Sequence, residues 1–204
     1  MECYGYGIND AWIDACLKFL DFSHSITWCG RRYFIMDDLL MHIKVPNVNK
    51  EVSELCPWDR TLCSDYISAA LSEKKGYEIR RIYNYGEDRI DQYKMVVSMM
   101  KENANFCYTI SCVDPKEDLV LKNTLPCLST VVITSIERRI CTKAVYSMMD
   151  LFTYGLLDMY QMANLQKHLC EDTGFDLGEL SLFISQATMS FENRMVLEKY
   201  LAAR

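Results

Sequence analysis

The chain has 204 residues, of which 50% are apolar and 12% aromatic, and its 22 basic and 28 acidic side chains give a formal net charge of −6. This composition excludes an intrinsically disordered chain, and the length predicts a single domain over residues 1–204. The acidic balance provides no general attraction for nucleic acid or for anionic membranes, so neither is an expected partner.

The N-terminus and the cysteine usage indicate a reducing compartment. No basic region followed by an apolar stretch opens the chain, and no apolar run approaches the roughly 20 residues that a spanning helix needs. The ten cysteines include no CxxC pair, and His24, His42 and His168 lack the spacing of a zinc site. We therefore expect a cytoplasmic protein with free thiols, no membrane attachment and no metal ion.

The first half of the chain predicts helices on either side of a strand region. Apolar residues recur at helical spacing over 9–22, which predicts a core-facing helix. An apolar, poorly periodic run over 31–45 predicts one or two strands, because a turn containing proline and asparagine follows it. Further helices are predicted over 60–74 and 88–102, and the charged pair at 80–81 is expected on a solvated face.

The second half of the chain is richer in β-branched residues and contains one long apolar segment. This segment is apolar all round, which predicts a helix buried in the middle of the domain. Strands and helices in this order predict an α+β fold. The predicted elements are strands over 106–113, 128–136, 139–146 and 180–184, a turn over 114–118, and helices over 148–170 and 191–200.

Three local patterns resemble the thymidylate synthase family, whose members add a one-carbon group to C5 of a pyrimidine nucleotide. The first is the stretch Tyr-Asn-Tyr-Gly-Glu-Asp-Arg-Ile-Asp-Gln over 83–92, and the second is Leu-Pro-Cys over 125–127. The third is Asp150 followed by Gly155 and Asp158 in an apolar helix. Cys127 precedes Asp150 by 23 residues and Asp158 by 31, which is the family's own gap-free spacing.

The resemblance implies that Cys127 is a nucleophile. A pyrimidine C5 reacts poorly with a one-carbon electrophile until a thiolate adds at C6 and makes C5 nucleophilic. The thiol must then be reachable and partly ionised. The resemblance also places Tyr85, together with Arg89, in the wall of the catalytic site. The competing interpretation is that Cys127 is simply one of ten packed thiols.

Asp158 stands where thymidylate synthases carry an asparagine that reads the uracil edge. Aspartate at this position is similar to the deoxycytidylate hydroxymethylases of the same family. Because a carboxylate accepts a hydrogen bond from an exocyclic amine, the exchange favours a cytosine-like ring over a uracil-like ring. The competing interpretation is a helical aspartate that faces water or a partner subunit.

The remaining site residues are implied by the resemblance alone. Asp150, with Tyr154 and Gly155, would contact the cofactor, 5,10-methylenetetrahydrofolate. On the substrate side, Arg31 or Arg32 would stand for the family's N-terminal arginine. Tyr146 replaces a glutamine of the family's hairpin, and Ser147 replaces an arginine.

Several of the family's nucleotide contacts are missing. Its paired phosphate-binding arginines fall at Phe106 and Cys107, and the residues that read the ribose fall near Thr188 and Ser190. Since only arginine offers a bidentate match to phosphate, a nucleotide would lose most of its anchor. The resemblance, with these losses, therefore implies a methyl or hydroxymethyl transferase acting on a non-phosphorylated or unusual pyrimidine-type substrate in specialised metabolism.

Two other functions stay open. One is a noncatalytic homologue that serves as a dimeric binding or scaffold protein, and the other is a cysteine-dependent enzyme acting on a non-pyrimidine substrate. The resemblance also implies the family's architecture, a six-stranded mixed sheet with helices on one face. The other face would pack against that of a second copy, so a homodimer is expected.

Overall fold

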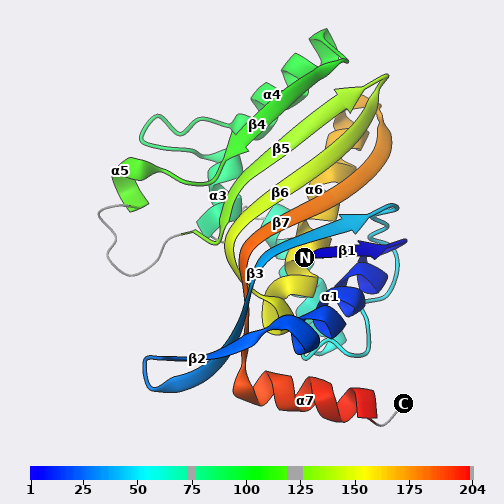
Figure 1. Ribbon diagram of the computed structural model, residues 1–204. Coiled ribbons are helices and arrows are strands. Elements are labelled where there is room, and N and C mark those ends of the chain that lie inside the picture. The colour runs from blue at the N-terminus through cyan, green and yellow to red at the C-terminus, as the bar shows by residue number, and fades with distance from the viewer. Residues whose placement is uncertain (73–76, 119–125, 203–204) are drawn as a thin grey trace.

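In the computed structural model, which describes residues 1–72, 77–118 and 126–202, the chain forms an α+β fold built on one mixed, open sheet (Figure 1). The strand order is β1-β3-β7-β6-β5-β4, and β2 pairs with β3 beside this path. The expected number of six strands was wrong, because the first two strands form outside the predicted strand regions. The seven strands are β1 (Glu2–Gly5), β2 (His24–Trp28), β3 (Arg31–Ile43), β4 (Phe106–Ser111), β5 (Leu128–Ile136), β6 (Arg139–Asp150) and β7 (Asp176–Ser190).

The strands predicted over 128–136 and 139–146 are present as β5 and β6, and a two-residue turn joins them into a hairpin. Ile136 pairs with Arg139, and the two residues between them, Glu137 and Arg138, have φ angles of +51° and +62°. Two successive positive φ angles define the turn that matches the right-handed twist of paired strands. β6 then pairs in parallel with β7, and β7 pairs in antiparallel fashion with β3.

The helices gather on one side of the sheet, where α6 runs behind the strands in Figure 1. The predicted helices over 9–22 and 191–200 are confirmed, and the one expected over 60–74 is confirmed as far as Ser72, since residues 73 and 74 lie outside the described residues. The helix expected over 88–102 begins at residue 92, after the Asp91 side chain caps it. The helices are α1 (Ile8–Phe22), α2 (Arg60–Ser72), α3 (Tyr77–Tyr83), α4 (Gln92–Glu102), the single turn α5 (Pro115–Asp118), α6 (Leu156–Thr173) and α7 (Phe191–Ala202).

The long apolar segment is a buried central helix, as predicted, but it starts later than expected. β6 continues through Asp150, whose backbone pairs with Thr188 of β7. A π-helix, η1 (Leu151–Gly155), then leads into α6. Gly174 ends α6 with a φ of +70°, the left-handed conformation that glycine adopts without strain.

The face of the sheet opposite α6 carries no helix among the described residues (Figure 1). A cross-strand row on this face includes Leu40, Phe183 and Val145, which occupy neighbouring positions on β3, β7 and β6. Phe183 is 37% exposed, and Leu40 and Val145 are half-buried. No helix of the described residues is both long and apolar enough to cross a membrane.

Candidate functional site

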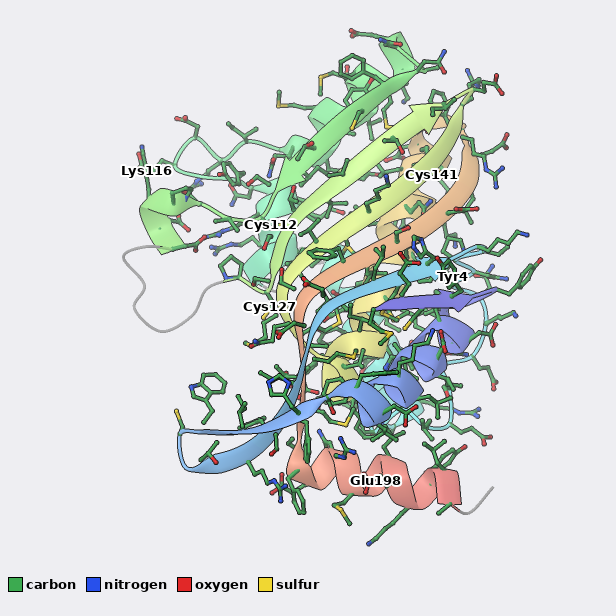
Figure 2. The ribbon with its side chains drawn as sticks, viewed as in Figure 1. Tyr4, Cys112, Lys116, Cys127, Cys141 and Glu198 are labelled. Carbon is green, nitrogen blue, oxygen red and sulfur yellow. The ribbon has the colours of Figure 1, made fainter. Side chains whose placement is uncertain are left out.

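Cys127 immediately precedes β5, and Figure 2 shows it at the lower end of that strand. Its carbonyl oxygen accepts hydrogen bonds from the backbone N–H of Ser147, at 2.8 Å, and from the Ser147 hydroxyl, at 3.2 Å. The Ser147 hydroxyl also lies 3.1 Å from the carbonyl oxygen of Pro126. The Cys127 side chain is half-buried and packs at the edge of the core. β6 therefore fixes the backbone of the predicted nucleophile.

Tyr146 and Ser147 are neighbours in β6 with opposite environments. Tyr146 is 3% exposed and belongs to the hydrophobic core, whereas Ser147 is exposed. This difference follows from the alternation of side chains along a strand. Of the two predicted substrate contacts, the structure leaves Ser147 reachable from solvent beside Cys127.

Asp150 caps the π-helix that follows it. One carboxylate oxygen accepts from the backbone N–H of Thr153 at 2.9 Å, and the other accepts from the Thr153 hydroxyl at 2.8 Å. The Asn193 amide of α7 donates to the same hydroxyl at 2.8 Å. Asp150 thus shapes the turn from β6 into α6. Such π-helical turns are frequent at functional sites.

An aromatic cluster surrounds the start of α6. The Tyr154 ring, 41% exposed, lies 5.6 Å from the Trp58 ring and 6.3 Å from the Tyr66 ring, between ring centroids. The Trp58 indole N–H donates to the carbonyl oxygen of Thr153 at 2.6 Å. The Tyr66 hydroxyl donates to one carboxylate oxygen of Asp158 at 3.2 Å. Asp150, Tyr154 and Asp158 therefore belong to one neighbourhood, in which α2 supplies Tyr66.

Gly155 is the last residue of η1 and is buried. A Cβ at this position would lie 3.3 Å from the Met149 sulfur and 3.4 Å from a Leu151 methyl carbon. Gly155 was predicted to contact the cofactor. The close packing around it also favours a glycine at this position when no ligand is bound.

Arg31 and Arg32 lie on the hairpin of β2 and β3. The Arg32 guanidinium stands over the rings of Phe34 and Phe191, at 5.4 and 5.2 Å from their centroids, and Arg31 is exposed. The strand register places Ile35, Thr188 and Asp150 at one level, so Arg32 lies beyond Asp150 on the side away from Cys127. Along the strand direction the separation from Cys127 is roughly 20 Å. The structure does not bring these arginines to the thiol within one chain.

The motif over 83–92 contributes hydrogen bonds that hold the fold together. The Tyr85 hydroxyl donates to the carbonyl oxygen of Val113 at 2.9 Å, and its backbone pairs with that of Ile90. The Gln92 amide donates to the carbonyl oxygens of Arg81 and Ser111, at 2.9 and 2.8 Å. Tyr85 therefore fastens this loop to the end of β4.

Arg81 was expected on a solvated face, and that expectation was wrong. Its side chain is 2% exposed, because the guanidinium bonds both oxygens of Asp118, at 2.7 and 2.8 Å. It also donates to the carbonyl oxygen of Cys112 at 2.6 Å and to Glu117 at 3.0 Å. This ion pair joins α3 to α5. Nothing in the local charge pattern distinguishes it from Arg80, which is exposed.

A cavity of about 610 Å³ lies on the helical side of the sheet, between α2, α3, α4 and α6. Cys127 is not among the residues that line it. The open space that a flat heterocycle needs beside Cys127 is therefore not this cavity. Within the ranges that the structure describes, no three histidine, cysteine or acidic side chains gather in a way that would hold a metal ion.

No protein-family model matches the chain, and no curated protein matches it either.

Proposed function

We propose that the protein is a one-carbon transferase similar to thymidylate synthases, which adds a methyl or hydroxymethyl group at C5 of a cytosine-like ring. The observation that carries this proposal is the common location of its functional groups. β5 begins beside the end of β6, so Cys127, Ser147 and Asp150 lie at one end of the sheet, and Asp158 follows in the first turn of α6. The spacing of 23 and 31 residues from Cys127 supports the same assignment.

In the proposed reaction the Cys127 thiolate forms a bond to C6 of the ring. The C5–C6 π electrons move toward C5, which forms the new carbon–carbon bond to the one-carbon unit and then loses its proton to solvent or a nearby base. With that proton loss the bond from the one-carbon unit to its folate nitrogen would break, so tetrahydrofolate would leave and a methylene group would remain on C5. Water adds to this methylene to give a hydroxymethyl group, whereas a methyl group would need a hydride from the tetrahydrofolate. The S–C6 bond then breaks, which returns the thiolate and restores the ring.

Asp158 orients the ring in this proposal. One of its oxygens accepts a hydrogen bond from Tyr66, and a carboxylate has lone pairs for further donors. An exocyclic amine supplies such a donor, and a ring carbonyl does not. This preference supports a cytosine-like ring over a uracil-like ring.

The residues at η1 fit a pterin. Thr153 occupies one acceptor site on each oxygen of Asp150, which leaves lone pairs for the N–H groups of a pterin ring. The half-exposed Tyr154 ring provides an aromatic surface next to it. When bound, methylenetetrahydrofolate supplies the one-carbon unit.

The test is incubation with unphosphorylated pyrimidines and labelled methylenetetrahydrofolate. We expect label in cytosine-type compounds, and we expect Cys127→Ala to abolish the transfer while the protein still folds. Transfer that persists in Cys127→Ala, or no transfer to any pyrimidine, would remove the proposal. Asp158→Asn is the matched variant, because it should shift the preference toward uracil-type compounds.

The second candidate function is a noncatalytic dimeric scaffold. This function is favoured because both acidic side chains already have structural roles. Asp150 caps η1, and Asp158 accepts a hydrogen bond from Tyr66. It also agrees with the loss of the phosphate-binding arginines at Phe106 and Cys107. Calorimetry with folates and nucleosides separates the two functions, because a scaffold binds neither. A covalent adduct of another mass on Cys127 would instead indicate a different cysteine-dependent reaction.

The proposal includes a homodimer formed by the uncovered face of the sheet. Half-buried Leu40 and Val145 and the exposed Phe183 give this face an apolar centre. Light scattering should give the mass of a dimer for the wild type and of a monomer for Val145→Glu. A wild-type monomer at micromolar concentration would contradict this arrangement.

A further inference from the structure

The cavity on the helical side has the volume of a small-molecule site. Its volume of about 610 Å³ falls inside the range in which proteins enclose ligands of drug size. Cys127, Asp150 and Asp158 do not line it. The cavity is therefore separate from the transferase site proposed above, and a ligand in it would not be the substrate of that site.

One stripe of α6 forms a wall of the cavity. Tyr160, Asn164 and His168 are spaced by four residues, so they lie on the same face of the helix. Exposure increases along the stripe, because Tyr160 is 2% exposed, Asn164 is half-buried, and the His168 side chain is 50% exposed. The stripe thus runs from the floor of the cavity to its rim.

Two further aromatic rings belong to the lining of the cavity. The Tyr83 and Tyr93 rings, from α3 and α4, lie 5.4 Å apart between centroids at an interplanar angle of 44°. The Tyr93 hydroxyl donates to Asp172 at 2.6 Å, which fixes its ring. Ile67 of α2 adds an apolar side chain. Rings that are held in place favour a planar ligand, because little side-chain freedom is lost on binding.

Asn164 is an uncharged polar group in the middle of the α6 wall of the cavity. Its side-chain amide makes no hydrogen bond with another residue of the described chain. Asparagine is also a weaker helix former than alanine or leucine, so nothing in the local helix explains its presence. The amide presents two N–H donors and one acceptor, which together recognise a ligand edge that carries a donor beside an acceptor.

The rim of the cavity carries charges of both signs. Arg60 lies 3.3 Å from Glu51, and His168 lies 3.3 Å from Glu171. Lys50 and Asp172 also line the cavity. Because cations and carboxylates alternate there, the rim favours neither a phosphate nor a strongly cationic ligand.

We infer that this cavity binds an uncharged planar heteroaromatic molecule of the nucleobase class. The ligand's ring packs among Tyr83, Tyr93 and Ile67, and an edge with adjacent donor and acceptor groups pairs with the Asn164 amide. Such an edge occurs in cytosine and adenine. The site is independent of Cys127 and of the reaction proposed for it.

The test is calorimetric titration with cytosine, adenine, and a dimethyluracil that is methylated on both ring nitrogens. We expect saturable binding of cytosine or adenine, no binding of the methylated compound, and a dissociation constant roughly tenfold higher or more in Asn164→Leu. Failure of both bases to bind overturns the inference. So does equal binding of the methylated compound, or an unchanged dissociation constant in Asn164→Leu.

Two further variants make the result independent of folding and of the transferase proposal. Ser64→Trp replaces an exposed residue of the cavity lining with a bulky ring, so it must abolish binding even if Asn164→Leu does not fold. Cys127→Ala should bind the base as the wild type does. If the wild type and Cys127→Ala both bind the base and neither of them transfers the labelled carbon, only the transferase proposal fails.

Discussion

The two candidate regions differ in how their polar side chains are used. At the Cys127 end of the sheet, the acidic residues of the recognisable pattern already make intramolecular hydrogen bonds, with Asp150 to Thr153 and Asp158 to Tyr66. In the cavity beside α6, Asn164 belongs to none of the motifs that resemble the family, and its side chain has no partner among the described residues. A motif thus indicates which residues a fold retains, whereas an unused polar group next to open space indicates where a ligand fits.

The largest effect is expected at the buried ion pair that joins α3 to α5. Arg81 is in α3, two residues before Tyr83 of the cavity, and Asp118 is the last residue of α5. Arg81→Leu removes the Arg81 guanidinium from the buried carboxylate of Asp118, at a cost of about 3–5 kcal/mol in the free energy of unfolding. Urea denaturation measures this loss, and both functions should decline together.

Arg80→Leu is the matched control, because the neighbouring arginine is exposed. We expect it to change stability by less than about 0.5 kcal/mol. The double variant Arg81→Leu with Asp118→Leu should be less destabilised than the sum of the two single variants, because neither charge is then left alone. Additive losses would mean that the two side chains do not stabilise the fold as a pair.

Much of the fold was predictable because it follows from local patterns. The strand over 128–136 was predicted with the residue bounds that β5 has, and the helices α1, α2 and α7 lie close to their predicted ranges. β1 has only four residues and pairs in parallel with the distant β3, so its short sequence carries no periodic signal. The start of α6 was misplaced since Met148 and Met149 suit a buried helix and a buried strand equally well.

The candidate site was less predictable, since hydrogen-bond partners depend on the tertiary structure. The sequence identified Asp150 and Asp158 but not Thr153 or Tyr66, which hold their carboxylates. For the same reason the sequence did not distinguish the buried Arg81 from the exposed Arg80, since the ion pair with Asp118 forms only in the folded chain. The cavity wall carried one usable signal, the four-residue spacing of Tyr160, Asn164 and His168, which places them on one face of the helix.

An intermediate effect is expected from the cap at Asp150. Asp150→Ala removes the acceptor for the Thr153 N–H and should lower the free energy of unfolding by about 1 kcal/mol. Asp150→Ser keeps a capping oxygen, so most of that stability should return. If the carboxylate also contacts a pterin, Asp150→Ser should still lose label transfer. Equal stability losses in the two variants would show that the carboxylate does not act as a cap.

The smallest effect concerns the tyrosines of the cavity at alkaline pH. Burial, and then the charges of Asp91 and Asp172, raise the pKa of Tyr83 to about 12, and burial raises the pKa of Tyr160 to about 12. A pKa above the ordinary value of 10 means that the stability from each neutral hydroxyl is complete below about pH 10. It is then lost as the pH rises through the folded-state value.

Tyrosinate absorbance and urea denaturation, measured together across this pH interval, test the prediction. Tyr83→Phe and Tyr160→Phe should each flatten the alkaline loss of stability and remove part of the late-titrating absorbance. A bound nucleobase should delay the titration further in the wild type but not in Asn164→Leu, because only an occupied cavity excludes more water from the two rings. If both rings titrate at the ordinary tyrosine pKa, then water already reaches them, and the cavity lacks the buried aromatic floor that the inferred ligand needs.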